Sequence, residues 1–414
     1  NTAVGDHAMK LTTTGTFNVA VGDNALCANT TASSNVAIGR DTMFANTTGA
    51  NNTAVGALSL DANTTASNNI AVGMSAMTTN TTGHSNVAVG TSALQSNNTA
   101  EQNVAVGYQS LFYNVGSGPQ NIAIGACSLY GQSGNCSYKN IGIGFTAGKC
   151  ITTGTDNAFI GNGAGVNITT GKFNSIIGSA LSGVAGAAGE ALTTGSCNVA
   201  LGNGALKLTS TASNNVAVGT LALCSNSTAP CNVAVGYLAG KSITVGCENV
   251  TIGMGAGCSI TTGDNNTFIG RTAALNATTG NNNNTFGTNS GNDAVKNITT
   301  ESHQIVMGSN GNTHAFIKID WTVTSDLRDK TEIEDVPHGL NFINQITPIK
   351  YKFKTSREDD TPAGDKKYGF KAQEILALEG DNPVIINNDD TDNLKLTNAH
   401  LIPVLVNAIK ELKA

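Results

Sequence analysis

The sequence predicts an all-β repeat shaft, a β-solenoid or β-roll with 17-residue coils, followed by a small α+β domain that ends in a helix. Two observations predict this division. Up to residue 308, a glycine closes a phrase of the form Asn-Val-Ala-Val-Gly about every 17 residues. Residues 325–414 then hold 12 Lys and Arg and 16 Asp and Glu, which is 28 of the 50 charged residues of the chain.

The repeat comes first, because internal repeats determine how every other feature is interpreted. Most closing glycines are 17 residues apart, and four intervals are longer, at 18, 19, 24 and 21 residues. We interpret each interval as one coil, and we expect the segment 183–190 of the longest interval to be a loop that leaves the shaft. The closing glycines are Gly5, Gly22, Gly39, Gly56, Gly73, Gly90, Gly107, Gly125, Gly144, Gly161, Gly178, Gly202, Gly219, Gly236, Gly253, Gly270, Gly287 and Gly308.

A short strand precedes each closing glycine. Val, Ile or Leu stands directly before nearly every closing glycine and usually again two residues earlier, as Val19 and Val21 do. Apolar residues at a period of two predict a strand with one buried face. The residue between them is usually alanine, such as Ala20, and it points to the opposite face. Its small size predicts a surface that a partner of the shaft approaches closely.

The other positions of the coil complete a solenoid. Asn stands four residues before most closing glycines, as Asn18 does, and stacked coils would align these amides in a hydrogen-bonded ladder. A small residue and then Leu, Met or Gly, as in Ala25-Leu26, predicts a second short strand. Polar turns such as Asn46–Gly49 follow. Gly and β-branched residues oppose a helix at this density, and one coil alone buries too little to be stable.

Composition excludes several classes of function. The net charge of −6 is spread along the chain, so we expect no nucleic-acid partner. No run of 18 apolar residues exists, so we expect no membrane insertion. Nine irregularly spaced cysteines without a C-x-x-C pair, and six scattered histidines, predict neither a metal site nor a cofactor; we interpret the cysteines as small apolar fillers. Because the chain begins inside a repeat, we expect it to be a fragment or a processed product.

Three local patterns resemble functional motifs but follow from the repeat. Gly236–Ser242 has three residues between its glycines, whereas a phosphate-binding loop needs four. The Asn-x-Thr and Asn-x-Ser sequences are explained by turn chemistry, and adjacent threonines fall in turns and not in the ranks of an ice-binding strand. No carboxylate pair recurs beside an aromatic cleft, so a glycan-cleaving site would have to form between subunits.

The segment around Ser325 is the place where the two compositions meet. Before it, residues 309–324 break the period and alternate enough for a strand or two, with the single Trp321. Taken alone, Ser325-Asp326 followed by charged residues is also an ordinary helix N-cap. The residues that follow favour a more specific interpretation.

Residues 325–333, Ser-Asp-Leu-Arg-Asp-Lys-Thr-Glu-Ile, resemble the opening of the endosialidase-type intramolecular chaperone domain, which ends many bacteriophage tail fibres and tailspikes. The resemblance continues through Gly339–Pro348, Ile349–Phe353, Tyr368–Glu374 and Leu401–Leu412. Together with the repeat and its interruption, it predicts three regions: a shaft at 1–308, a connection at 309–324 and a chaperone and autoprotease domain at 325–414. The repeat phrase itself resembles the coil motif in the heads of trimeric autotransporter adhesins.

The resemblance to the chaperone family also implies a site. It places the scissile bond between Thr324 and Ser325, with Ser325 as nucleophile, Lys330 as base, and Asp326 and Arg328 in support. These residue types suit the chemistry, because a serine hydroxyl needs a base to take its proton. A lysine serves as that base only where burial or a positive neighbour such as Arg328 favours its neutral form. We expect packing of the trimer to provide that burial.

The expected function is therefore a homotrimeric segment of a bacteriophage tail fibre that is assembled in the host cytoplasm and becomes part of the virion. Its expected partners are further copies of itself, other tail proteins and a host surface glycan or protein receptor. A trimeric cell-surface adhesin with a chaperone domain remains open, as does a glycan depolymerase with an inter-subunit site.

The last expected element is a helix near the C-terminus. Leu401, Leu405, Ala408, Ile409 and Leu412 follow one another at helical spacing and predict a single apolar face. Two interpretations of this face stay open at this point, packing within the domain or a three-helix seam in the trimer.

Overall fold

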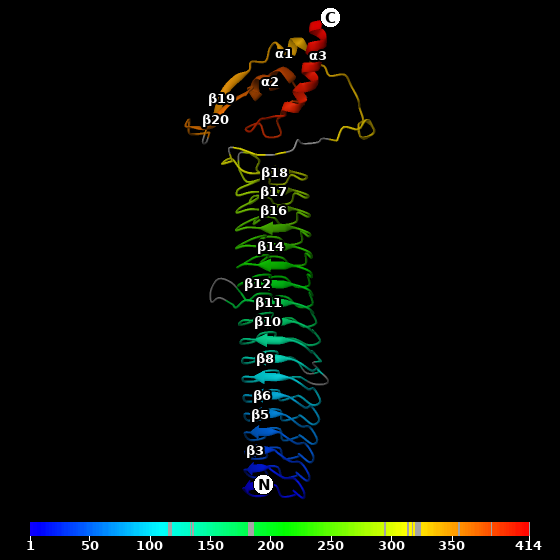
Figure 1. Cartoon of the computed structure of the whole chain (residues 1–414), viewed down its shortest axis with the longest axis vertical. Coiled ribbons are helices and arrows are strands. Elements are labelled where there is room, and N and C mark those ends of the chain that lie inside the picture. Colours follow the sequence, from blue (N-terminus) through cyan, green and yellow to red (C-terminus); the bar gives the residue numbers. More distant parts are fainter. Residues whose placement is uncertain are drawn as a thin grey trace. The chain divides into compact units, whose positions relative to one another are not determined.

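The computed structural model describes residues 1–114, 118–132, 134, 136–180, 186–293, 295–312, 314–316, 318, 324–354, 357–381 and 383–413. They form two compact units, Asn1–Ser309 and Asn310–Ala414 (Figure 1). The first unit ends with the repeats. Most of the expected connecting strand, including Trp321, lies outside the described residues. The domain start at Ser325 stays a prediction.

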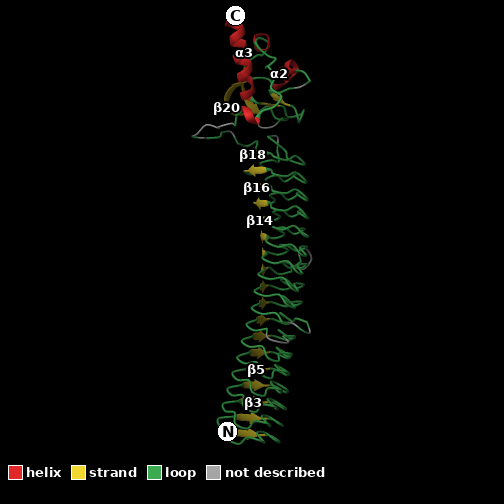
Figure 2. Cartoon of the chain, turned by 90° about the vertical axis from the view of Figure 1, so that its right-hand side faces the viewer, coloured by secondary structure: helices red, strands yellow, loops and turns green. Residues whose placement is uncertain are grey.

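The first unit is a parallel β-solenoid with one strand per coil, which confirms the predicted fold class. Eighteen strands of three residues form one sheet, and each residue pairs with its equivalent in the next coil, as Val19 does with Val36. Figure 2 shows these strands stacked above one another, with loops and turns making up the rest of each coil. The strands are β1 Thr2–Val4, β2 Val19–Val21, β3 Val36–Ile38, β4 Thr53–Val55, β5 Ile70–Val72, β6 Val87–Val89, β7 Val104–Val106, β8 Ile122–Ile124, β9 Ile141–Ile143, β10 Ala158–Ile160, β11 Ser175–Ile177, β12 Val199–Leu201, β13 Val216–Val218, β14 Val233–Val235, β15 Val250–Ile252, β16 Thr267–Ile269, β17 Asn284–Phe286 and β18 Ile305–Met307.

The two faces of the strand are the reverse of the prediction. The central alanine is the residue that is buried, as Ala20 and Ala37 are, with no exposed surface. The flanking apolar residues point outward, so that Val21 and Ile38 are 36% and 40% exposed. A 17-residue coil encloses little space, and a methyl group fills what remains beneath the strand. Period-two spacing identified the strand correctly but not which face lies in the core.

The expected second strand is also absent from the described coils, and a turn takes its place. Asn24 and Leu26 have positive φ values of 54° and 49°, and their equivalents in other coils do the same. Leu26 nevertheless donates its N–H to the carbonyl of Thr42 in the next coil at 3.0 Å. Backbone φ values of alternating sign therefore preserve the hydrogen bonds between neighbouring coils and direct the Leu26 side chain into the core.

Large and small core residues exchange positions between two common kinds of coil. Leu26 accompanies Asn29 in one kind of coil, whereas Gly165 accompanies Ile168 in the other, so the large apolar side chain moves three residues along the chain. The glycine also makes room for Phe159, because a Cβ at Gly165 would lie 2.6 Å from Phe159 Cδ1. Further pairs of the second kind are Gly148 with Ile151, Gly240 with Ile243 and Gly257 with Ile260.

The predicted asparagine ladder is present and fully buried. Asn249 Nδ2 donates to Asn232 Oδ1 at 3.1 Å and to the carbonyl of Gly263 at 2.8 Å. Its Oδ1 accepts the backbone N–H of Asn266 at 3.0 Å. Each amide thus satisfies buried backbone groups of its own and adjacent coils, which would otherwise cost about 1–3 kcal/mol apiece. The ladder therefore ties consecutive coils together.

A second ladder, which sequence reasoning did not identify, lies in the following turn. Asn63 Nδ2 donates to Asn46 Oδ1 of the preceding coil at 2.7 Å and to the carbonyl of Ala66 at 3.0 Å. Each asparagine of this row stands three residues after a buried Leu or Met, as Asn63 follows Leu60 and Asn46 follows Met43. Coils with glycine and isoleucine at these two positions have no asparagine to extend the row.

Two further expectations about the shaft need correction. The loop expected at 183–190 falls partly outside the described residues, and its described end packs onto the shaft, since Ala187 and Ala188 are buried. The cysteines do not share one environment: Cys224 is buried, whereas Cys197 and Cys231 are exposed. The interpretation as apolar fillers therefore fits Cys224 and fails for Cys197, Cys231 and Cys136, which is also exposed.

Glu301 in the last coil makes this part of the shaft sensitive to acid. Its carboxylate accepts the N–H of Thr299 at 2.7 Å and the Lys296 ammonium at 2.9 Å. Burial alone would raise the pKa of Glu301, but these hydrogen bonds outweigh it and lower the pKa from 4.5 to about 2. Because the folded pKa is depressed, the stabilisation is complete above pH 4.5 and is lost as pH falls toward about 2.

We therefore expect the melting temperatures of wild type and Glu301→Gln to differ above pH 4.5 and to converge as pH falls toward about 2. Thermal unfolding followed by circular dichroism at a series of pH values measures this difference. A difference that stays constant across the window would contradict the assigned hydrogen bonds.

The second unit combines short helices with two antiparallel strand pairs. Strand β19 pairs with β20, and β21 pairs with β22. Helices α2 and α3 and the α1 turn surround a small core. Its buried members are Phe342, Ile375, Ile385, Ile386, Leu401 and Val404. The elements are η1 Leu327–Asp329, α1 Leu340–Ile343, β19 Ile349–Lys354, β20 Pro362–Gly369, α2 Ala372–Glu379, β21 Ile386–Asn387, β22 Lys395–Leu396, η2 Asn398–His400 and α3 Leu401–Lys413.

Helix α3 has two apolar faces and not the single face that was expected. Leu401, Val404 and Ala408 are buried in the unit, which confirms packing within the domain for that side. A second row is exposed and consists of Ile402, Leu405, Val406, Ile409 and Leu412. The expected face mixed members of both rows. The exposed row leaves the three-helix seam as a prediction.

Candidate functional site

The candidate site is a tight turn at the start of the predicted chaperone domain. Asp326 caps the one-turn helix η1 (Leu327–Asp329), because its Oδ1 accepts the N–H of Arg328 at 2.9 Å. The turn closes when the Lys330 N–H donates to the carbonyl of Leu327 at 3.1 Å. A chain reversed in this way returns residue 330 toward residue 325.

The reversal brings the two predicted reactive side chains into contact. Lys330 Nζ donates a hydrogen bond to Ser325 Oγ at 2.9 Å. This is the distance at which a base can take a proton from a hydroxyl. Sequence spacing alone did not require the contact, since two residues five apart in an extended chain would lie far from each other.

Asp326 and Arg328 pair with each other and not with the reactive pair. The Arg328 guanidinium contacts both carboxylate oxygens, with Nη2 to Oδ2 at 2.6 Å and Nε to Oδ1 at 3.1 Å. These hydrogen bonds lower the pKa of Asp326 and raise the pKa of Arg328. The pair therefore holds the two ends of this short turn together, and its supporting role in cleavage stays a prediction. Because Asp326 balances its charge, Arg328 does not act on Lys330 as an isolated positive neighbour.

The site is open to water in the single chain, where Thr324, Ser325 and Lys330 are all exposed. Only a neutral amine takes a proton from the serine hydroxyl, whereas an ammonium donates to the serine oxygen. The geometry is thus assembled, while the burial that favours a neutral amine is not supplied by this chain alone.

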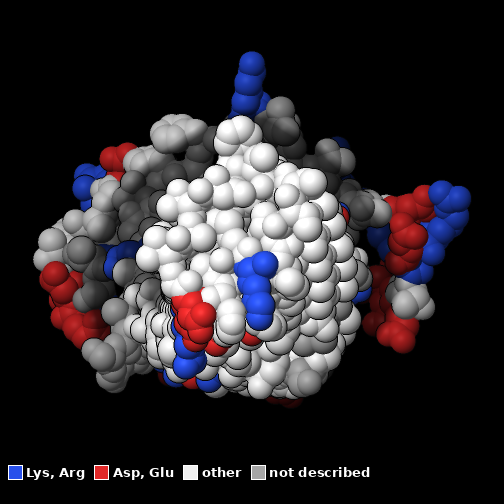
Figure 3. All heavy atoms as spheres, turned by 90° about the horizontal axis from the view of Figure 1, so that it is seen from below, with Lys and Arg blue, Asp and Glu red and all other residues white. Residues whose placement is uncertain are grey.

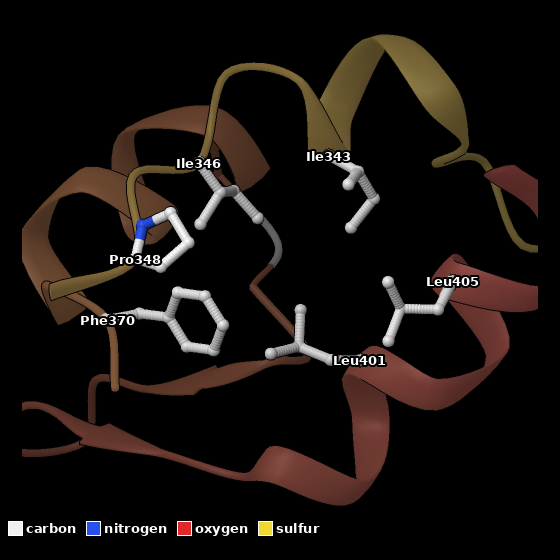
Figure 4. A pocket seen from close by; sticks show the side chains of 6 residues that line it. All are labelled: Ile343, Ile346, Pro348, Phe370, Leu401 and Leu405. Atoms are coloured by element: carbon white, nitrogen blue, oxygen red, sulfur yellow. The ribbon is translucent and has the colours of Figure 1, made fainter. Parts of the chain in front are cut away.

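Other parts of the described residues offer weaker candidates. An apolar cavity of about 190 Å³ in the second unit is lined by Ile343, Ile346, Pro348, Phe370, Leu401 and Leu405 (Figure 4). Its lining contains no group for acid, base or nucleophilic chemistry. Asp6, His7 and Asp23 bring possible metal-ligand atoms together, but all three are exposed, and exposed carboxylates gather without a metal in many proteins.

The shaft surface carries little charge. Viewed from its N-terminal end, few acidic or basic side chains interrupt the uncharged surface (Figure 3). The segment Gly236–Ser242, which resembles a phosphate-binding loop in sequence, is part of an ordinary coil, with Ala239 buried in the core. Within the described parts of the chain, no helix has the length and apolar character needed to cross a bilayer.

Comparison with known proteins agrees with the sequence at the candidate site. A family model described as the chaperone of endosialidase matches residues 325–382. The match begins at Ser325, the predicted nucleophile, and it ends before helix α3. No curated protein and no solved structure matches the chain. The C-terminal part of the chain is therefore similar to this chaperone family, and the β-solenoid precedes it.

Proposed function

We propose that the chain is a segment of a trimeric bacteriophage tail fibre whose C-terminal domain assists assembly and then cleaves itself from the shaft between Thr324 and Ser325. The observation that carries the proposal is the 2.9 Å contact between Lys330 Nζ and Ser325 Oγ at the first residue of the family match. A nucleophile and base at the start of a chaperone domain, just after a repeat shaft, support release of the shaft.

The proposed reaction transfers the acyl group of Thr324 and then adds water. Neutral Lys330 takes the proton of Ser325 Oγ, and Oγ attacks the Thr324 carbonyl carbon. The C–N bond to Ser325 breaks, and its nitrogen receives the proton from Lys330. The resulting ester, between the Thr324 carbonyl and Ser325 Oγ, is hydrolysed by water to the Thr324 carboxylate and the Ser325 hydroxyl. The serine and lysine act once, so no further turnover follows.

We propose that assembly controls this reaction by removing water from the turn. In the single chain both reactive side chains are exposed. Packing of neighbouring subunits over the turn would favour the neutral lysine, because burial penalises the charged form. Cleavage would then follow correct assembly.

The proposed role in a virion follows from the same domain arrangement. A solenoid shaft that precedes a chaperone domain in the sequence suits a host-recognition appendage assembled in the host cytoplasm. Its partners would be other tail proteins and a host glycan or protein receptor. Gold-labelled antibody against residues 1–308 tests this role. Label on virion tails supports it, and label confined to the surface of a bacterial cell favours an adhesin.

The cleavage itself is tested on the purified full chain. We expect denaturing electrophoresis and intact mass to show two products, residues 1–324 and 325–414, with Ser325 at the N-terminus of the smaller one. An uncut chain in fully assembled protein, or a cut at another bond, would overturn the proposed reaction.

A further inference from the structure

The outward residues of the strands form one continuous apolar surface, which we name the outer strand face. It consists of the first and third residues of strands β1–β18. The third residue is apolar in all eighteen strands, and neither position holds a charged residue in any of them. Of the 31 large apolar side chains that are exposed among the described residues of the first unit, 18 lie on this face. Exposed apolar surface is thus concentrated on one side of the coil.

The extent of this face exceeds what a single soluble chain normally exposes. Of its 36 side chains 30 are large and apolar, and 15 of these are 36–45% exposed, so the face presents on the order of 1,000 Å² of apolar surface. The largest patch on a typical monomer is about 300–600 Å², whereas a stable interface takes about 800 Å² from each partner. The area therefore matches an interface between proteins.

The regularity of the face identifies its partner. Equivalent residues pair in register from coil to coil, as Val216, Val233 and Val250 do, so the face repeats at the spacing of neighbouring strands, about 4.8 Å. A partner that covers it along its whole length must repeat at the same spacing, and another copy of this chain does. We infer that the outer strand face is the surface through which copies of the shaft associate, side by side and parallel. This inference rests on the proposed self-association and specifies its surface, in place of the alanine row first expected.

The same regularity leaves one feature unspecified. Because successive strands present nearly the same residues, a shift of one copy by a whole coil keeps most apolar contacts, as repetitive strand pairing permits in general. The apolar face alone therefore holds copies together without setting their axial register. Register must come from parts of the chain that do not repeat, and the second unit (Asn310–Ala414) is the largest of them.

Photo-crosslinking in the full chain tests the surface and the register together. Benzoylphenylalanine replaces Val235, which lies on the outer strand face and is 37% exposed. In a matched sample it replaces Thr228, which is exposed in a turn of the same coil. We expect adducts between chains from position 235, mapped by mass spectrometry to strands β13–β15 of the other copy, and none from position 228.

The outcomes separate this inference from the proposed cleavage. Adducts are scored in wild type and in Ser325→Ala, so the result does not depend on whether the chain is cut. Association by sedimentation without adducts at position 235, or with equal adducts at position 228, overturns the assigned surface, as does a chain that sediments as a monomer. Adducts spread over distant strands overturn the register assignment alone.

A second arm uses charge in place of a crosslinker. Leu201→Glu with Val235→Glu places carboxylates on the outer strand face, and Thr194→Glu with Thr228→Glu places them in turns of the same two coils. We expect the first pair to dissociate the shafts in sedimentation and the second pair to leave them associated. Circular dichroism reports whether the coils stay folded; if the first pair unfolds them, the crosslinking arm still decides.

Discussion

Ser325→Ala is expected to leave the 414-residue chain uncut, because the methyl group offers no nucleophile for the Thr324 carbonyl. Loss of a nucleophile of this kind lowers the rate by at least about 10⁴-fold. Denaturing electrophoresis against wild type, sampled over time after assembly, measures the effect. Ser309→Ala removes a hydroxyl upstream of the site and should cleave at the wild-type rate.

Lys330 provides the second half of this prediction. Lys330→Met keeps the length of the side chain but removes the amine that contacts Ser325 Oγ at 2.9 Å. Loss of a general base costs about 10²–10⁴-fold in rate, so cleavage should become very slow while Ser325 is still present. Lys371→Met, a change of the same kind outside the site, should have no effect.

Asp326→Ala separates positioning from chemistry. It removes the N-cap of η1 and the partner of Arg328, so the turn that brings Lys330 to Ser325 is held less firmly. Cleavage should therefore be slower but still occur. Cleavage of Ser325→Ala at the wild-type bond would disprove the mechanism. If Asp326→Ala abolished cleavage while Lys330→Met cleaved normally, Lys330 would not be the base.

Gly253→Ala is expected to destabilise the shaft by more than about 3 kcal/mol. Gly253 closes β15 with a φ of 129°, a conformation that residues with a Cβ rarely adopt. The added Cβ would also lie 2.6 Å from the carbonyl carbon of Gly270 in the next coil, and backbone cannot yield as a flexible side chain can. Strain and overlap therefore act together.

Gly255→Ala is the matched control, two residues further along the chain. Its φ is 67°, in the left-handed region where a Cβ costs only about 1–2 kcal/mol. The added methyl would lie 3.5 Å from Thr272 Cγ2, which is ordinary contact. Urea unfolding of the two variants, with hydrogen exchange of the amides of β15 and β16, measures the difference. Equal destabilisation would show that the close stacking at Gly253 contributes nothing beyond backbone conformation.

Chain periodicity predicted the parts of the fold that depend on one coil being like the next. Equivalent residues must stack when identical segments repeat, and so the Asn249 ladder and the position of the strand were predictable. The faces of the strand were not. A Val at position 21 signals burial, but it can be buried in the core of its own coil or against another copy, and a pattern within one chain does not distinguish the two.

The candidate site divides in the same way. Residue types and their resemblance to a family identified Ser325, Lys330, Asp326 and Arg328, because a nucleophile, a base and a charged pair are chemical identities. How they pair was decided by the turn. When the turn closes, Lys330 contacts Ser325 and Asp326 pairs with Arg328. Because its charge is balanced by Asp326, Arg328 does not act on Lys330 as an isolated positive neighbour.

The sequence by itself determined that this chain is a solenoid of 17-residue coils joined to a domain like the chaperone of endosialidase, because the repeat period and the residue types are properties of the chain. Only the tertiary structure decided that Ala20 lies inside and Val21 outside, and that Lys330 meets Ser325. The physical reason is the same in both cases. The room for side chains inside a coil and the closure of a turn both depend on distances between backbone segments in space. The order of residues along the chain does not state those distances directly.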